Sequence, residues 1–123
     1  MMMLTLTIAN KIERRDSMNA PKEHKEQRAV LGWLRKRGYF VYAIPNHKEM
    51  RIYDGAVSGL PDLQISLEGG KVIWIEMKRT KGGRLSQEQV EIHAYLKSIG
   101  HIVILGYGAK DAVAKLKPHL ELD

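Results

Sequence analysis

Two carboxylates and a lysine occupy positions that a β-hairpin would bring together. Asp62 opens an apolar segment, and Glu76 and Lys78 close the next apolar segment. The sequence Glu68-Gly69-Gly70 lies between the two segments and is typical of a turn. Because side chains alternate between the faces of a strand, Glu76 and Lys78 share a face. In an antiparallel hairpin Asp62 then lies near Glu76 at the same end of the sheet.

Such a cluster has a use in chemistry on phosphate esters. Two neighbouring carboxylates bind a hard cation such as Mg²⁺, which prefers oxygen ligands and keeps several waters. The cation lowers the pKa of a bound water and stabilises charge on a phosphate oxygen. Lys78 reaches the same centre and could orient the attacking water or neutralise the developing charge. The alternative is an ordinary ion-paired hairpin end, because surface ion pairs are common.

A basic, glycine-containing segment directly follows the strand that ends at Lys78. Arg79, Lys81 and Arg84 flank the pair Gly82-Gly83. Basic side chains on a loop beside a metal site suit phosphate contacts, which position DNA without reading its sequence. The chain has 20 Lys and Arg against 14 Asp and Glu, a net charge of +6 that favours polyanions. The alternative interpretation is a solvated turn on a mildly basic protein.

A second polar loop precedes the strand that begins at Asp62. It runs from Pro45 to Gly59 and carries Lys48 and Arg51. Connections of this length are uncommon unless they are functional. We expect this loop to border the carboxylates, with Lys48 and Arg51 contacting DNA, whereas a merely solvated loop is the alternative.

Hydrophobic periodicity predicts the elements that position these residues. Three- and four-residue spacing predicts a first helix from Pro21 to Gly38. The other predicted elements are strands at 39–44, 62–67, 71–78 and 101–105 and helices at 86–99 and 109–117. Ser86 and Gln89 form a capping box at the start of the second helix. Gly106 is expected to loosen the chain before the last helix, and Pro118 to end that helix.

The order of these elements predicts an α/β fold with a mixed sheet flanked by helices. A helix between the third and fourth strands requires a parallel pair beside the antiparallel hairpin. The 123 residues suit one domain over 20–123, preceded by an N-terminal arm over 1–19. The absence of cysteine excludes disulfides and thiolate zinc sites. Apolar stretches are too short to span a membrane, so we expect a cytoplasmic protein.

The motifs resemble those of a known nuclease superfamily. Gly59-Leu60-Pro61-Asp62, followed after thirteen residues by Glu76-Met77-Lys78, resembles the PD-(D/E)XK signature. Leu85-Ser86-Gln87-Glu88-Gln89 follows, and a helix beginning with Glu23-His24-Lys25-Glu26-Gln27 precedes. Together these segments resemble the VRR-NUC branch over residues 20–117. The resemblance implies a restriction-endonuclease-like αβββαβ core, which matches the predicted order of elements.

The resemblance also implies a role for each matching residue. Asp62 and Glu76 match the carboxylates that bind Mg²⁺ or Mn²⁺, and the backbone carbonyl of Met77 matches a main-chain metal ligand. Lys78 matches the catalytic lysine. Gln89 matches a glutamine that usually lies beside the active site, although the capping box alone also explains it.

A glutamate on the first helix completes the site that the resemblance implies. Glu26 is our choice, because its spacing from Val30 and Leu34 turns it toward the core. Glu23, one turn earlier, is the alternative. His93 lies one turn beyond Gln89, and we interpret it as a packed or surface histidine rather than a catalytic residue.

The expected function is therefore a metal-dependent, structure-selective DNA endonuclease that leaves a 5′-phosphate and a 3′-hydroxyl. Small stand-alone members of this type resemble Holliday-junction resolvases, act as homodimers on branched DNA in recombination or repair, and suggest a bacterial or phage source. The alternatives are a flap- or nick-directed nuclease, a non-catalytic DNA-binding module with the same fold, and an assembly protein with an acidic partner. The retention of Asp62, Glu76 and Lys78 together argues against the non-catalytic module.

Overall fold

The computed structural model describes residues 25–45, 55 and 57–120. The elements in chain order are α2 (Lys25–Lys36), β1 (Val41–Ala43), β2 (Leu63–Ser66), the 3-10 helix η3 (Glu68–Gly70), β3 (Val72–Lys78), α3 (Gln87–Ser98), β4 (Ile102–Tyr107), α4 (Ala109–Leu116) and the 3-10 helix η4 (Lys117–Leu120). The predicted order is confirmed, with element ends that shift by a few residues. The predicted arm, residues 1–19, lies outside the described residues. None of the described helices is long and apolar enough to cross a membrane.

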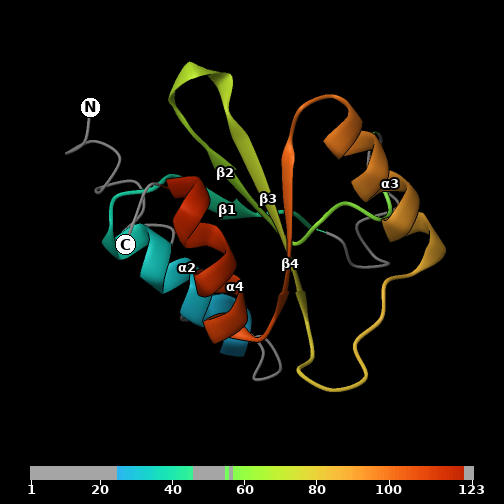
Figure 1. The fold of residues 1–123 in the computed structure, drawn as a ribbon, viewed down its shortest axis with the longest axis horizontal. Helices are drawn as coiled ribbons and strands as arrows, with labels where there is room; N and C mark the ends of the chain where they lie inside the picture. Colours follow the sequence, from blue (N-terminus) through green and yellow to red (C-terminus); the bar gives the residue numbers. More distant parts are fainter. Residues whose placement is uncertain (1–24, 46–54, 56, 121–123) are drawn as a thin grey trace.

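The four strands form one mixed sheet in the order β1-β2-β3-β4 (Figure 1). β2 is antiparallel to both β1 and β3, and its Leu63 pairs with Ile75 of β3. β3 and β4 are parallel, with Ile75 beside Ile104. Both the predicted hairpin and the predicted parallel pair are therefore confirmed. The end of β3 lies between the start of β2 and the end of β4, where three segments can contribute side chains.

The helices cover the two faces of the sheet unequally. In Figure 1, α2 and α4 lie on one side of the sheet and α3 lies on the other. The apolar core lies between the sheet and the pair α2 and α4, and its members are Val30, Leu31, Leu34, Val41, Leu63, Ile65, Ile73, Ile75, Ile104, Ala112, Leu116 and Leu120. Trp74 and Glu76 alternate with Ile73 and Ile75 along β3 and are also buried. The α3 side of β3 thus buries a carboxyl group.

One sequence expectation near the end of the chain is wrong. β4 continues past Leu105, and Gly106 is a buried residue of the strand rather than a loosened connection. A Cβ at Gly106 would lie 2.5 Å from the Cβ of Ala112, so glycine is what lets α4 approach the sheet. α4 ends at Leu116, before Pro118, as expected, and the 3-10 helix η4 then runs through the proline, which is tolerated in a first helical turn.

Candidate active site

The hairpin register brings Asp62 and Glu76 to the same end of the sheet. Because Leu63 pairs with Ile75, the next register position sets Asp62 opposite Glu76. Asp62 does not continue the backbone ladder there. Its side-chain Oδ2 instead accepts a hydrogen bond of 2.8 Å from the backbone N–H of Met77. This bond holds the Asp62 carboxylate against the edge of β3.

In the same register, the segment leading into β2 offers no backbone N–H to the carbonyl of Met77. The position opposite Met77 is Pro61, which follows from the pairing of Leu63 with Ile75. The N–H and C=O of one strand residue point to the same side, so the Met77 carbonyl also faces the side of Asp62. Proline has no N–H with which to pair that carbonyl. The Met77 carbonyl and the Asp62 carboxylate therefore lie on the same side of β3, at the end of the hairpin.

Glu76 is the most deeply buried acidic group of this cluster. Its residue is 2% exposed, and its Oε2 lies 3.6 Å from the Nζ of Lys78. Its Oε1 lies 3.8 Å from Nε2 of His93 and has no hydrogen-bond partner among the described residues. Burial, and then the nearby charge of Asp62, raise the pKa of Glu76 to about 8. At neutral pH this carboxyl group holds its proton unless a cation compensates its charge.

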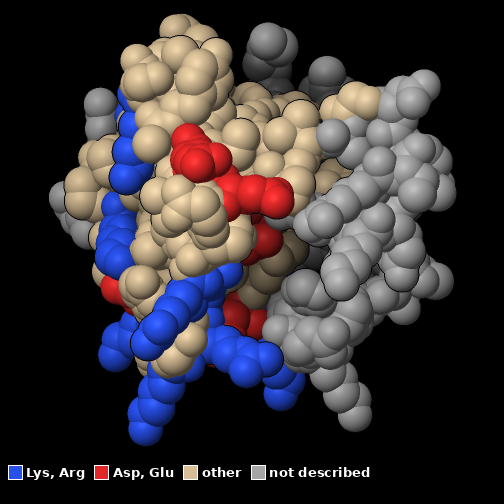
Figure 2. Space-filling model, turned by 90° about the vertical axis from the view of Figure 1, so that its right-hand side faces the viewer, with Lys and Arg blue, Asp and Glu red and all other residues tan. Residues whose placement is uncertain are grey.

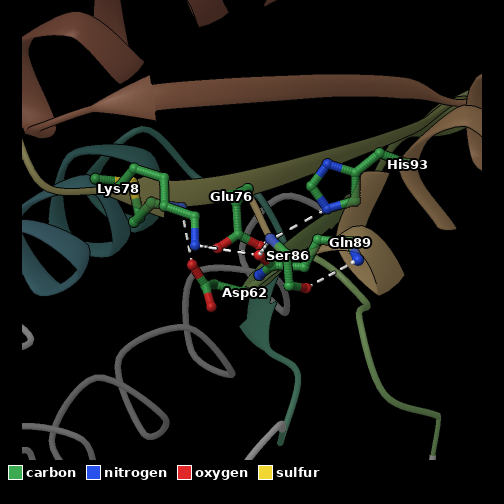
Figure 3. A network of polar contacts seen from close by, with 7 residues as sticks. Asp62, Glu76, Lys78, Ser86, Gln89 and His93 are labelled. Carbon is green, nitrogen blue, oxygen red and sulfur yellow. Dashed lines mark hydrogen bonds and ion pairs between the residues drawn. The ribbon is translucent and has the colours of Figure 1, made fainter. Parts of the chain in front are cut away.

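Lys78 is held by the first turn of α3. Its Nζ donates to Oε1 of Gln89 at 3.2 Å, and the same oxygen accepts from the backbone N–H of Ser86 at 2.9 Å. Ser86 Oγ in turn accepts from the backbone N–H of Gln89, which completes the predicted capping box. The structure thus joins the two explanations of Gln89, because one amide oxygen both caps the helix and positions the lysine (Figure 3).

A glycine on the segment leading into β2 sets the distance between Asp62 and α3. Gly59 is buried, and its φ is +92°, a conformation that other residues rarely adopt. A Cβ at this position would lie 2.9 Å from the backbone oxygen of Glu88 in α3. Only glycine lets the segment pack this closely on the first turn of the helix, next to Gln89.

His93 also belongs to the site, although the sequence interpretation treated it as a packed or surface residue. It lies on α3, one turn beyond Gln89, and its ring is buried beside Glu76 (Figure 3). Burial, followed by the charges of Lys97 and Lys78, lowers the pKa of His93 below its ordinary value of 6.5. The ring is therefore neutral at neutral pH. The sequence does show that Gln89 and His93 share a face of the helix, but it could not show that the His93 ring would contact Glu76.

Glu26 is placed elsewhere in the described structure. Its Oε2 accepts a hydrogen bond of 2.6 Å from the backbone N–H of Ala109, the first residue of α4. No hydrogen bond or ion pair joins Glu26 to Asp62, Glu76 or Lys78 among the described residues. Glu26 is exposed rather than turned toward the core, and it lies at the start of α4, whose N-cap residue Gly108 has no side chain to offer. The alternative, Glu23, lies outside the described residues.

The basic loop directly follows Lys78 at the end of β3. Arg79, Lys81 and Arg84 are all exposed. Figure 2 faces the α3 side of the molecule and shows acidic atoms near the centre of this face, with basic atoms along its left and lower edges. Lys48 and Arg51, the other predicted DNA contacts, lie outside the described residues.

The donors at this end of the sheet suit a hard divalent cation. No group of three or more His, Cys, Asp or Glu side chains in the described ranges could hold a metal by itself. Mg²⁺ does not require one, because it binds through one or two carboxylates and retains water or phosphate ligands. A cation beside Asp62 would compensate the charge of the buried Glu76 carboxylate, whose pKa is otherwise raised to about 8. The carbonyl of Met77 would be a further oxygen ligand. The residues therefore fit the metal that the resemblance implies.

Comparison with known proteins was informative only at the level of structure. No family model and no curated protein sequence matches the chain. A solved structure described as a VRR_NUC domain is 26% identical, with a TM-score of 0.63, and the match covers 81% of this chain and 98% of that one. A second, described as a VRR_NUC domain protein, is 20% identical, with a TM-score of 0.65, and the match covers 85% and 93%.

These matches agree with the topology and the site described above. The mixed four-stranded sheet with its three helices is a restriction-endonuclease-like α/β fold. Within that class, the chain folds as a VRR-NUC domain, as its motifs predict. Its fold is therefore that of a nuclease-type domain.

Proposed function

We propose that this chain is a metal-dependent, structure-selective DNA endonuclease that hydrolyses phosphodiester bonds. One observation carries the proposal. The carboxyl group of Glu76 is buried, lies opposite Asp62 and has its Oε2 3.6 Å from Nζ of Lys78, in a nuclease-type fold. Burying a carboxylate is unfavourable unless its charge is compensated, and a bound cation would supply that compensation.

Asp62, Glu76 and the carbonyl of Met77 are the residues that would hold Mg²⁺ or Mn²⁺. Such an ion, when bound, activates water and stabilises negative charge on the phosphate. Asp62 is fixed for this task by its bond to Met77, and Glu76 is fixed by burial. Neither carboxylate needs to reorganise much to meet a cation, which favours binding.

Lys78 supplies the positive charge that the chain itself brings to the reaction. Its side chain is 19% exposed, so the ammonium group that Gln89 holds can meet a phosphate at the surface. From this place the ammonium group orients the attacking water and stabilises the charge that develops on the phosphate oxygens. In-line attack by water breaks the bond to the 3′ oxygen and leaves a 5′-phosphate and a 3′-hydroxyl.

The substrate of this proposal is branched DNA, and the active form is a homodimer. Arg79, Lys81 and Arg84 would contact the phosphate backbone next to the cleaved bond. These contacts do not read sequence, so selectivity would come from the shape of the DNA. A two-fold symmetric dimer would present two sites to a four-way junction.

The test is cleavage of labelled four-way junction, flap, nicked and linear duplex DNA in Mg²⁺ and in Mn²⁺. We expect junction cleavage that requires a divalent cation and that Lys78→Ala lowers by roughly 100-fold or more. Lys36→Ala is the matched control, because it removes one exposed lysine from α2, a helix that lies on the other side of the sheet.

Each contrary outcome removes a defined part of the proposal. Cutting confined to flaps or nicks would retain the nuclease and discard the resolvase-like activity. A monomer in sedimentation experiments with junction DNA would discard the dimer. DNA binding without cleavage in either metal would leave a binding module with a nuclease fold.

A further inference from the structure

Two buried polar atoms face each other on the α3 side of β3, and neither has a hydrogen-bond partner among the described residues. They are Oε1 of Glu76 and Nε2 of His93, and they lie 3.8 Å apart. Both residues are almost completely buried, at 2% and 5% exposed. Unpartnered buried polar atoms are rare in folded proteins, and two of them in apposition require an explanation.

The distance between Oε1 of Glu76 and Nε2 of His93 exceeds the range of a hydrogen bond by a few tenths of an ångström. Hydrogen bonds at catalytic sites are often long before the site is loaded and shorten in the working complex. The pair thus has the geometry of a hydrogen bond that is not yet closed.

The two oxygens of Glu76 have different neighbours, which divides their tasks. Oε2 faces Lys78, whereas Oε1 faces His93 (Figure 3). A carboxylate that binds a metal through one oxygen is commonly oriented by a hydrogen bond to the other oxygen. His93 is the residue on the described part of the chain that is placed to supply such a bond.

We propose that His93 is a positioning residue for Glu76, whose Nε2–H donates to Oε1 and orients Oε2 toward the bound cation. This inference rests on the proposed function, because it assigns the partner of a residue that would hold the metal. His93 would then contact the cation only through Glu76 and would not bind the cation itself. The described His, Asp and Glu side chains do not form a three-ligand group, which agrees with this placement.

The first experiment measures Mn²⁺ binding directly, without DNA. His93→Phe keeps a planar ring of similar size but removes the N–H, and His93→Gln retains a donor. We expect the apparent dissociation constant for Mn²⁺, from calorimetry or electron paramagnetic resonance, to rise about 10–100-fold in His93→Phe. We expect His93→Gln to recover most of that loss, because an amide N–H can take the place of the ring donor. Tyr95→Phe, an exposed position on the same helix, is the matched control and should bind like the wild type.

The second experiment requires no substitution and so does not depend on how a variant folds. The ¹⁵N resonances of the His93 ring are followed in the wild-type protein as Mg²⁺ is added. We expect Nε2 to carry the proton and its resonance to move on saturation, with no such movement for His101. An Nε2 that bears no proton in the loaded protein would overturn the proposal, because it would be an acceptor or a direct ligand.

The outcomes separate this proposal from the proposed function. If the wild type binds Mn²⁺ and cuts DNA while His93→Phe binds the ion equally well, the role of His93 is overturned and the nuclease remains. Equal weakening in His93→Phe and His93→Gln would likewise overturn the donor role. If the wild type binds no Mn²⁺ and cuts no DNA, the proposed function fails and this inference fails with it.

Discussion

The two faces of β3 differ in what they bury, although they belong to the same seven residues. Ile73 and Ile75 enter an apolar core in which α2 and α4 contribute aliphatic side chains. Glu76, near the end of the strand, points to the α3 side, where it lies beside His93 and Lys78. Apolar burial stabilises a fold on its own, whereas the orphaned groups under α3 cost free energy. The face toward α2 and α4 therefore stabilises the fold, whereas the face toward α3 holds the candidate site residues at some cost to stability.

The helices on the two sides are held in correspondingly different ways. α2 buries Val30, Leu31 and Leu34 against the sheet, whereas α3 buries only His93 and Leu96. α3 is instead fixed by its capping box and by the close approach of Gly59 to Glu88. The position of α3 thus depends on the same residues that form the candidate site. Loading the site with a cation should strengthen this side and leave the other unchanged.

Neighbouring substitutions on the two faces should have opposite consequences. Ile75→Ala leaves a cavity in a fully buried position and should lower the free energy of unfolding by about 2–5 kcal/mol, measured by urea denaturation. Glu76→Gln removes the proposed metal ligand at nearly constant volume and should lower the cleavage rate by roughly 100-fold or more. Molecules of Ile75→Ala that remain folded at low temperature should still cut DNA.

The contrast between the two faces would fail if either Ile75→Ala or Glu76→Gln behaved as the other is expected to. Loss of cleavage in folded Ile75→Ala would mean that the core face also sets the geometry of the site. A strong loss of stability in Glu76→Gln without added metal would mean that the buried carboxyl group supports the fold. Circular dichroism on both variants under the cleavage conditions supplies the necessary check of folding.

The raised pKa of Glu76 predicts a pH dependence of stability in the absence of metal. In the folded chain the pKa is about 8, against an ordinary value of 4.5, so between these values the unfolded chain has lost a proton that the folded chain retains. The free energy of unfolding should therefore fall as pH rises from about 4.5 to 8, by at most about 1.4 kcal/mol per pH unit for one group. Below this window the contribution of Glu76 is fully present, and above it the contribution is lost.

The measurement is urea unfolding in a chelator across this pH range, for the wild type and Glu76→Gln. The difference between the two isolates Glu76, because the lowered pKa of His93 acts in the opposite direction in both proteins. We expect the stability of the wild type relative to Glu76→Gln to decrease with pH. Saturating Mg²⁺ should reverse the trend, because the ion favours the ionised carboxylate. Parallel curves in chelator would contradict the buried, protonated state.

The sequence was most informative where short-range rules apply. Alternation along β3 assigns Ile75 and Glu76 to opposite faces, and the spacing of Ser86 and Gln89 predicts the capping box that the structure contains. Contacts between segments far apart in the chain could not be found in this way. The apposition of His93 and Glu76 depends on the exact position of α3 over the sheet, and the need for Gly106 depends on how closely α4 approaches.

Glu26 shows the same limit, and it supports the smallest of the predicted effects. Its carboxylate caps the start of α4 from another helix, so Glu26→Ala should lower the free energy of unfolding by about 0.5–2 kcal/mol. Mn²⁺ affinity should stay that of the wild type, because the described contacts of Glu26 are with α4 and not with Asp62 or Glu76. Calorimetric titration of Glu26→Ala and of Asp62→Ala with Mn²⁺ compares the affinities of the two variants. Equal losses of affinity in the two variants would instead give Glu26 the metal-binding role that the family resemblance implies, and would require α2 to shift toward the site when the cation binds.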